Sequence, residues 1–308
     1  MMLVFLTTYI IPASASAKGV AVLVFHQVTL GPTNSVTMSP EDFTSTLQTL
    51  KQQGYNFIYL KDLHDYMAGN IQLPGKSVLI TFDDGYQDVY KYAHPTLVKL
   101  QVPAVMFPVM MYYRSDYRLP RQFTPHLSTD DIKAMQASGL WDFGGHSFDA
   151  HHQILCLPYE YGPFYTSYAW LGRRQETQLE YINRIEADLT TMTRTLSTLS
   201  LPVTDFAPPT GAINGTLRDL LSKNGIRYIY RQGNYLNYPG SNTLYRITVS
   251  SPEQVIKDLN NLYGNEVTPV IPGNNSDSPD ITTLKEYSLS LKHTIYNQNT
   301  FYQGGMRE

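Results

Sequence analysis

Three apolar runs of the sequence end on side chains that could transfer protons or bind a metal. The groups that follow the runs are His26, then Asp83 and Asp84, then His146 with His151 and His152. Two imidazoles and one carboxylate form a suitable three-ligand set for Zn²⁺ or a similar divalent ion, with positions left open for water and substrate. The residue types therefore indicate a metal site, provided that the fold brings the three groups together.

Each of these groups also has a simpler interpretation. Asp83, Asp84 and Gly85 are residue types common in turns, and the histidines could lie in a polar surface loop. His146 and His151 are five residues apart, so they would not share one face of a helix. As ligands they would have to lie at a strand end and in the loop after it.

The elements that would position these residues alternate between strands and helices. Apolar runs predict strands at 19–25, 56–60, 77–82, 103–110, 141–146, 205–211 and 227–231. Capping residues and helical spacing predict helices at 40–53, 61–67, 89–100, 129–138, 176–196, 215–224 and 252–263. Pro95 should interrupt one helix, and Leu179, Leu189 and Leu196 should share the apolar face of another. This alternation predicts an α/β fold, a distorted parallel (β/α) barrel of about seven units, in which the carboxyl ends of the strands share one face.

The residue types near the two ends of the sequence indicate the domain organisation. Leu3 to Ile11 is apolar and is followed by Ala15-Ser16-Ala17, so residues 1–17 are predicted to be a signal peptide. The usual basic segment before the apolar stretch is missing, which leaves an uncleaved N-terminal anchor as an alternative. We expect a catalytic domain at 18–264, and a linker and C-terminal tail at 265–308.

Cys156 is the only cysteine, and the net charge of −3 gives no support to nucleic-acid binding.

One longer motif favours the functional interpretation of the aspartates. Thr81-Phe82-Asp83-Asp84-Gly85-Tyr86 resembles the signature of polysaccharide deacetylases with NodB homology, also called carbohydrate esterase family 4. The stretch from His26 to Leu262 is similar to the branch that deacetylates poly-β-1,6-N-acetyl-D-glucosamine, a biofilm exopolysaccharide. The segments that carry this similarity are GYNFIYLKDL, LPGKSVLITFDDGY and GGHSFDAHH.

The resemblance implies a role for each candidate residue. It makes Asp83 the catalytic base, His26 the general acid, and Asp84, His146 and His151 the metal ligands. His152 is the alternative to His151 as a ligand. The implied cofactor is a divalent metal, Zn²⁺ first, although the same ligand set accepts Co²⁺, Ni²⁺ or Fe²⁺.

One segment departs from the family pattern. The family has a Pro-Tyr-Gly sequence where this chain has Pro209-Thr210-Gly211. The resemblance implies that the backbone N–H at this position helps to bind the oxyanion, and Thr210 retains that group but lacks the ring. Tyr86 could line the sugar groove, although packing in the core is an equally good interpretation.

The resemblance implies a metal-dependent N-deacetylase, a hydrolase acting on poly-β-1,6-N-acetyl-D-glucosamine by means of a metal-activated water. The implied location is secreted or at the cell surface, and the resemblance also implies an association with exopolysaccharide synthesis machinery. Alternative enzyme substrates are peptidoglycan, chitin and acetylated xylan. A different alternative, motivated by Thr210, is a degenerate family member that binds glycan without hydrolysing it.

Overall fold

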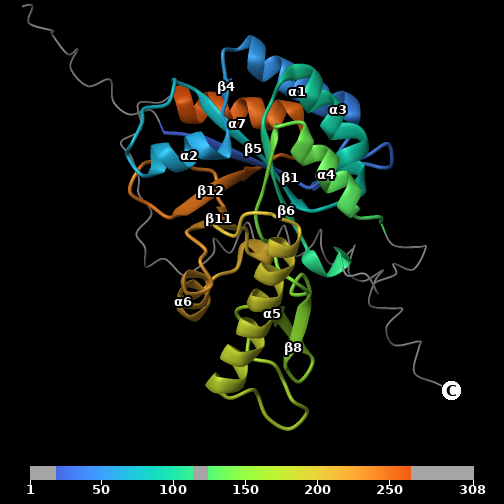
Figure 1. Cartoon of the computed structure of the whole chain (residues 1–308), viewed down its shortest axis with the longest axis vertical. Coiled ribbons are helices and arrows are strands. Elements are labelled where there is room, and N and C mark those ends of the chain that lie inside the picture. The colour runs from blue at the N-terminus through green and yellow to red at the C-terminus, as the bar shows by residue number, and fades with distance from the viewer. Residues whose placement is uncertain (1–18, 114–123, 265–308) are drawn as a thin grey trace, which may run out of the picture.

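The computed structural model describes residues 19–113 and 124–264 of the 308-residue chain. The predicted N-terminal segment 1–17 and the predicted linker and tail 265–308 lie outside these described residues. Figure 1 shows helices α1, α3, α4 and α7 at one end of the molecule, over the strands, and α5 with strand β8 at the opposite end.

The central sheet consists of parallel strands in the order β10-β11-β12-β1-β5-β6-β7. These strands are β1 Ala21–Phe25, β5 Ser77–Asp84, β6 Ala104–Pro108, β7 Trp141–Phe143, β10 Asp205–Phe206, β11 Tyr228–Gln232 and β12 Thr243–Thr248. Just beyond β7, Gly145 pairs in parallel with Phe206 of β10. This bridge joins the two ends of the sheet, so the seven strands form a nearly closed barrel and the predicted fold is confirmed.

Shorter strands lie outside this path. β4 Asn56–Phe57 pairs with β5, β2 Gln27–Val28 pairs with β3 Thr37–Met38, and β8 Gln153–Leu157 forms an antiparallel hairpin with β9 Glu160–Pro163. The strand predicted at 56–60 is therefore shorter than expected, because Leu60 already begins helix α2. The hairpin and β12 were not predicted.

Helices cover the barrel, and several begin at capping residues that the sequence displays. They are α1 Pro40–Gln52, α2 Leu60–Met67, α3 His94–Leu100, α4 Thr129–Ala137, α5 Gln178–Thr198, α6 Gly215–Lys223 and α7 Pro252–Gly264, with shorter turns η1 Val89–Ala93, η2 Met110–Tyr113 and η3 Pro209–Gly211. Ser39, Ser128, Thr177 and Asn214 each accept a backbone N–H of the first turn of the helix that follows. Pro95 lies where the π-helical turn η1 gives way to α3, as an interrupted helix requires.

The apolar face predicted for α5 is partly wrong. Leu189 and Leu196 are buried, but Leu179 is 67% exposed. Leu179 belongs to the first turn of the helix, and Tyr181 and Ile185 fill the buried face instead. A polar residue, Asp188, is also buried on this helix.

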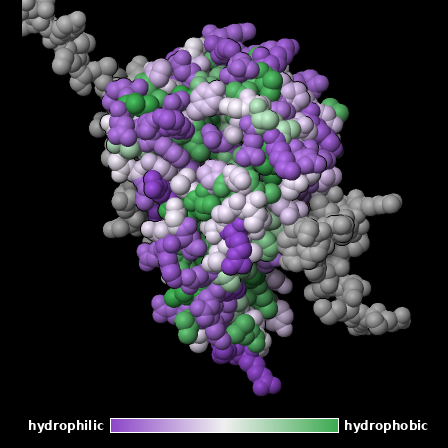
Figure 2. Space-filling model, viewed as in Figure 1, coloured by the Kyte–Doolittle hydropathy of each residue, from purple (hydrophilic) through white to green (hydrophobic). Residues whose placement is uncertain are grey.

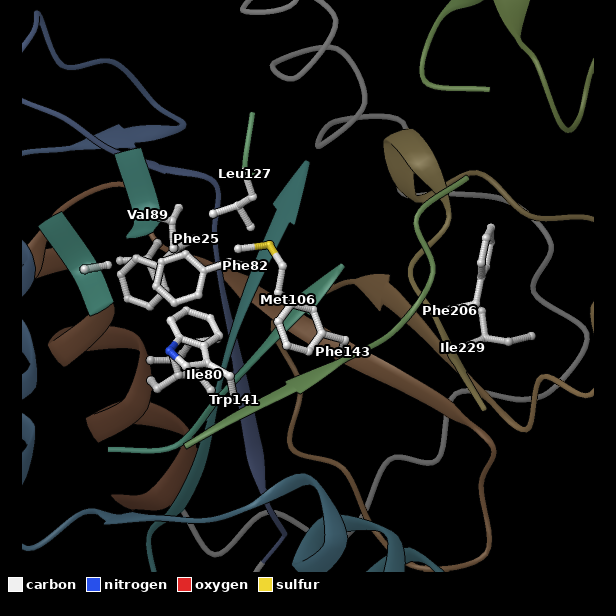
Figure 3. Close-up of a cluster of buried hydrophobic side chains, with 14 of the residues drawn as sticks. Phe25, Ile80, Phe82, Val89, Met106, Leu127, Trp141, Phe143, Phe206 and Ile229 are labelled. Carbon is white, nitrogen blue, oxygen red and sulfur yellow. The ribbon is translucent and has the colours of Figure 1, made fainter. Parts of the chain in front are cut away.

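Alternation along the strands separates two hydrophobic cores. The barrel interior contains Val22, Leu79, Val105, Phe107, Tyr230 and Leu244, among others. The larger core lies between the barrel and its helices, where Figure 3 shows Phe25, Ile80, Phe82 and Trp141 packed together. Because successive side chains of a strand point to opposite faces, Asp83 has the orientation of Leu79 and points into the barrel.

The surface of the described residues is mixed in polarity. Figure 2 shows polar side chains over most of one face, with apolar side chains in small separate patches. None of the helices in 19–113 and 124–264 has the length and apolar character needed to cross a membrane.

Candidate metal and catalytic site

Four of the predicted site residues, His26, Asp83, Asp84 and His146, lie at or just beyond the carboxyl ends of barrel strands. Phe25 of β1 is paired with Phe82 of β5, so the next residues, His26 and Asp83, come at the same level of the barrel. Asp84 is paired with Pro108 of β6, and the chain beyond β6 is bridged to Ser147, next to His146. The parallel register thus brings residues far apart in sequence to one end of the barrel.

Asp84, His146 and His151 form a compact cluster of possible metal ligands. One ligand atom from each lies within 4.8 Å of the others. Asp84 Oδ1 is 3.3 Å from His146 Nε2 and 3.1 Å from His151 Nε2. Oδ1 is buried, yet neither contact has hydrogen-bond geometry. Three ligand atoms that converge, one of them a buried oxygen without a hydrogen bond, fit a bound cation, and Zn²⁺ suits this set.

The orientation of His146 also fits a metal ligand. Its Nδ1 lies 2.6 Å from the carbonyl oxygen of Ala207, to which it donates a hydrogen bond. Because a carbonyl oxygen can only accept, Nδ1 carries a proton, and Nε2, which faces Asp84, is the nitrogen through which this ring could bind a metal. Ala207 follows β10, and its own N–H donates to the carbonyl of Gly145, so the acceptor is fixed by the closure of the barrel.

The charges within the cluster favour ionised Asp84. Burial by itself would raise the pKa of Asp84, but the charge of His151 and contacts with both histidines hold that pKa well below its ordinary value. Burial would lower the pKa of His151, and Asp84 reverses this effect, so that the pKa of His151 is raised. The carboxylate is therefore negative at neutral pH, as a metal ligand must be.

The backbone at the end of β5 turns sharply to present Asp84. Asp84 and Gly85 both adopt left-handed conformations, with φ of 70° and 84°. A Cβ atom added to Gly85 would lie 2.9 Å from Pro108 Cβ and 3.0 Å from the Tyr113 hydroxyl. Glycine is thus required at this position both by conformation and by space.

We expect Gly85→Ala to lower the free energy of unfolding by about 2 kcal/mol or more, from the left-handed backbone and the close contact with Pro108. Urea unfolding measures the effect. Gly69→Ala is the matched control, because Gly69 also has positive φ but a Cβ there would meet nothing within 4 Å. Equal losses in the two variants would contradict a steric contribution at Gly85.

Asp83 is held in a buried ion pair with Arg246 of β12. The guanidinium Nη1 and Nη2 donate to Oδ1 and Oδ2 of Asp83 at 2.6 and 2.7 Å. Both side chains are almost fully buried, and Arg246 is 1% exposed. Burial opposes ionisation of Asp83, but Arg246 and neighbouring histidines outweigh it and lower the pKa. Asp83 is therefore ionised at neutral pH and oriented by a two-point contact.

His26 is buried at the end of β1, with an exposure of 6%. Burial is the main influence on its pKa, which is lowered although Asp84 and Asp83 act in the opposite direction. Protonated His26 is thus a stronger acid than an exposed imidazolium.

The remaining predicted site residues surround the cluster less closely. Pro209 and Thr210 lie in η3, two and three residues after Ala207, and Thr210 has a left-handed φ of 61° that is unusual for a β-branched residue. Tyr86 is half-buried, with its ring 5.1 Å from that of His126. His152 is exposed and its ring packs against Phe164, outside the cluster that His151 joins.

Two residues of the site region were missed by sequence reasoning. Arg246 lies in the unpredicted strand β12, and nothing near it in sequence reveals that its partner is Asp83, 163 residues away. Asp188 lies on the predicted helix α5, and its contacts with the segment before His151 depend on tertiary packing.

The polysaccharide deacetylase family profile matches residues 70–229, which is more than half of the chain. The chain belongs to the polysaccharide deacetylase family. It is thus a member of a family of hydrolases, and the predicted recognition is confirmed. The matched segment contains Asp83, Asp84, His146, His151 and Thr210 but ends before Arg246.

Two curated relatives of this polysaccharide deacetylase bear the same name. The poly-beta-1,6-N-acetyl-D-glucosamine N-deacetylase of Escherichia coli K12 is 29% identical over 191 residues, covering 57% of this chain and 28% of the relative. The protein of the same name from Staphylococcus aureus COL is 25% identical over 238 residues, covering 75% of this chain and 74% of the relative. The chain therefore spans less than a third of the length of the Escherichia coli relative.

Solved structures support the fold of the polysaccharide deacetylase. A de-N-acetylase from Aggregatibacter actinomycetemcomitans has a TM-score of 0.71 at 23% identity, covering 78% of this chain and 99% of that one. IcaB from Ammonifex degensii has a TM-score of 0.66 at 29% identity, covering 79% of this chain and 97% of that one.

Proposed function

We propose that this chain is a metal-dependent N-deacetylase that removes acetyl groups from poly-β-1,6-N-acetyl-D-glucosamine. The observation that carries the proposal is the cluster of Asp84, His146 and His151 beside the ion-paired Asp83. The names of the curated relatives support the choice of substrate. Zn²⁺ is the proposed metal, because two imidazoles and one carboxylate suit it best.

Asp84, His146 and His151 would hold the metal in this proposal. When bound, a divalent cation polarises a carbonyl oxygen and lowers the pKa of water. Asp84 supplies a negative charge because its pKa is low, and the hydrogen bond from His146 Nδ1 to Ala207 orients the ring with Nε2 toward the metal position. His152 faces Phe164 and is not needed as a ligand.

Asp83 would act as the general base. It removes a proton from the water that attacks the acetamide carbonyl, and Arg246 keeps it both ionised and in a fixed orientation. His26 would donate a proton to the nitrogen of the departing amine, since the C–N bond breaks only when that nitrogen can leave as a neutral amine. No covalent bond between protein and substrate is needed.

The chain segment after β10 would contribute to the oxyanion site. The backbone N–H of Thr210 would donate to the oxygen that becomes negative in the tetrahedral intermediate. Pro209, which is buried, fixes the start of the turn. Tyr86 follows the turn after Asp84 and would contact the sugar.

Two alternatives make different predictions. Peptidoglycan, chitin fragments or acetylated xylan would each keep the same residues in the same roles. A glycan-binding protein without activity would have no need for a buried base paired with an arginine, so the Asp83–Arg246 pair favours an enzyme.

The test is acetate release from poly-β-1,6-N-acetyl-D-glucosamine oligomers by protein stripped with a chelator and then supplied with single divalent metals. We expect no release without metal and restored release with Zn²⁺, Co²⁺ or Ni²⁺. A parallel assay on chitin oligomers, peptidoglycan and acetylated xylan decides the substrate. Binding of the oligomer without release under any metal would refute the enzymatic proposal.

We also propose export of the protein and action at or outside the cell surface. The apolar stretch Leu3 to Ile11 and the sequence Ala15-Ser16-Ala17 support this location, and the polymeric substrate requires it. Contact with exopolysaccharide synthesis machinery follows from the substrate in the same proposal.

A further inference from the structure

The loop that carries His151 contains no regular secondary structure. Residues 147–152 run from the barrel to β8, and His151 is the single metal-cluster residue that is not on or next to a barrel strand. His146 is held by the barrel closure and by Ala207. The position of His151 therefore depends on whatever fixes this loop.

One side of the loop is fixed by the chain after β6. The backbone N–H groups of Met110 and Met111 donate to the carbonyl oxygens of Ser147 and Phe148 at 3.0 and 2.8 Å. These bonds position the first half of the loop through its carbonyl oxygens. The N–H groups of the loop need acceptors from another part of the protein.

The other side of the loop is fixed by Asp188 on α5. Its Oδ1 accepts the N–H of Phe148 at 3.0 Å, and its Oδ2 accepts the N–H of Asp149 at 2.7 Å. The Tyr165 hydroxyl also donates to Oδ1. Asp188 is 8% exposed, so the carboxylate is removed from water and all of these bonds lie within the protein.

We propose that Asp188 is a positioning residue for the metal site, acting through the loop on His151. This inference rests on the proposed function only for the assumption that the cluster binds a metal. The carboxylate supplies two acceptors to two successive N–H groups that end two residues before His151. Groups that orient a metal ligand in this indirect way affect metal affinity by about 10- to 100-fold when they are replaced.

Asp188→Asn tests the inference with little change in size. One of its two acceptors becomes an NH₂ group, which would face a backbone N–H of the loop and could not accept from it. We expect the dissociation constant for Zn²⁺ to rise by about 10- to 100-fold, measured by competition with a chromophoric chelator on stripped protein. The increase in Tm on adding Zn²⁺ should shrink accordingly.

Glu176→Gln is the matched control. Glu176 is also a buried carboxylate beside α5, and it accepts a backbone N–H from Ala169 together with two bonds from Arg184. It does not contact residues 147–152 through any of these bonds. We expect this variant to lose stability but to bind Zn²⁺ as the unaltered protein does. Equal effects of the two substitutions on Zn²⁺ affinity would overturn the proposal.

Tyr165→Phe provides a second test if Asp188→Asn does not fold. It removes one donor to Asp188 and retains the ring, and we expect Zn²⁺ binding to weaken by about threefold. Unchanged affinity in a folded Asp188→Asn, or in Tyr165→Phe when only that variant folds, overturns the role of Asp188. Because Zn²⁺ alone is the probe, failure of acetate release would refute the proposed function without altering this comparison.

Discussion

Replacement of Asp83 by Asn is expected to reduce acetate release by about 10²- to 10⁴-fold, the usual contribution of a general base. The Asn amide has nearly the same size but cannot take a proton from water at neutral pH. Asp83 is absent from the ligand cluster, so Zn²⁺ affinity should change little. Rates at saturating Zn²⁺ and the dissociation constant for Zn²⁺ should be measured on the same preparation.

The neighbouring residue provides the matched control for this experiment. Asp84→Asn should weaken Zn²⁺ binding strongly, because its buried Oδ1 is shared by His146 and His151. The two substitutions would thus have different effects: Asp83→Asn would lower the rate, and Asp84→Asn would weaken metal binding. If Asp83→Asn weakens Zn²⁺ binding as much as Asp84→Asn does, or keeps the full rate, the assignment of Asp83 as base is wrong.

The convergence of the site could be predicted because it follows from the strand pattern alone. Each apolar run ends on a polar group, and parallel strands of a barrel place such ends at one face. The structure brings Asp84 and His146 together by this means, and His151 joins them from the loop before β8. The choice between His151 and His152 could not be made from spacing, since both lie in the same loop. Their directions depend on tertiary contacts, of His151 with Asp84 and of His152 with Phe164.

Sequence reasoning also missed Arg246 and Asp188, and the reason is different. A single arginine in TLYRIT and a single aspartate in an amphipathic helix are typical of surface positions. Their burial is favourable only because each finds a partner far away in sequence, Asp83 in one case and the N–H groups of Phe148 and Asp149 in the other. Leu179 illustrates the converse, since its position at the helix start leaves an apolar side chain exposed.

Breaking the ion pair between Asp83 and Arg246 should lower the free energy of unfolding strongly. We expect Arg246→Met, which retains much of the side-chain volume, to lower the free energy of unfolding by about 3–5 kcal/mol at pH 7, because it leaves a buried carboxylate without its partner. Urea unfolding of the metal-free protein measures the loss.

The pH dependence of this loss distinguishes the ion pair from simple packing. In the unaltered protein the pKa of Asp83 is lowered, so its contribution to stability is complete above the ordinary Asp pKa of about 4 and is lost as the pH falls through the lowered value. Without Arg246 the effect of burial would raise the pKa, and Asp83 would reduce stability increasingly as the pH rises above about 4. The difference between the two proteins should therefore be largest at pH 7 and shrink toward pH 4.

The double variant Asp83→Asn with Arg246→Met completes the test. Without a carboxylate at position 83, the loss caused by Arg246→Met should be much smaller at pH 7, and the difference in pH dependence should disappear. A loss that is the same at pH 4 and pH 7, and the same with Asn at position 83, would mean that Arg246 stabilises the barrel by packing against Phe107 and not by its charge. The proposed mechanism would then lose the group that keeps its base ionised.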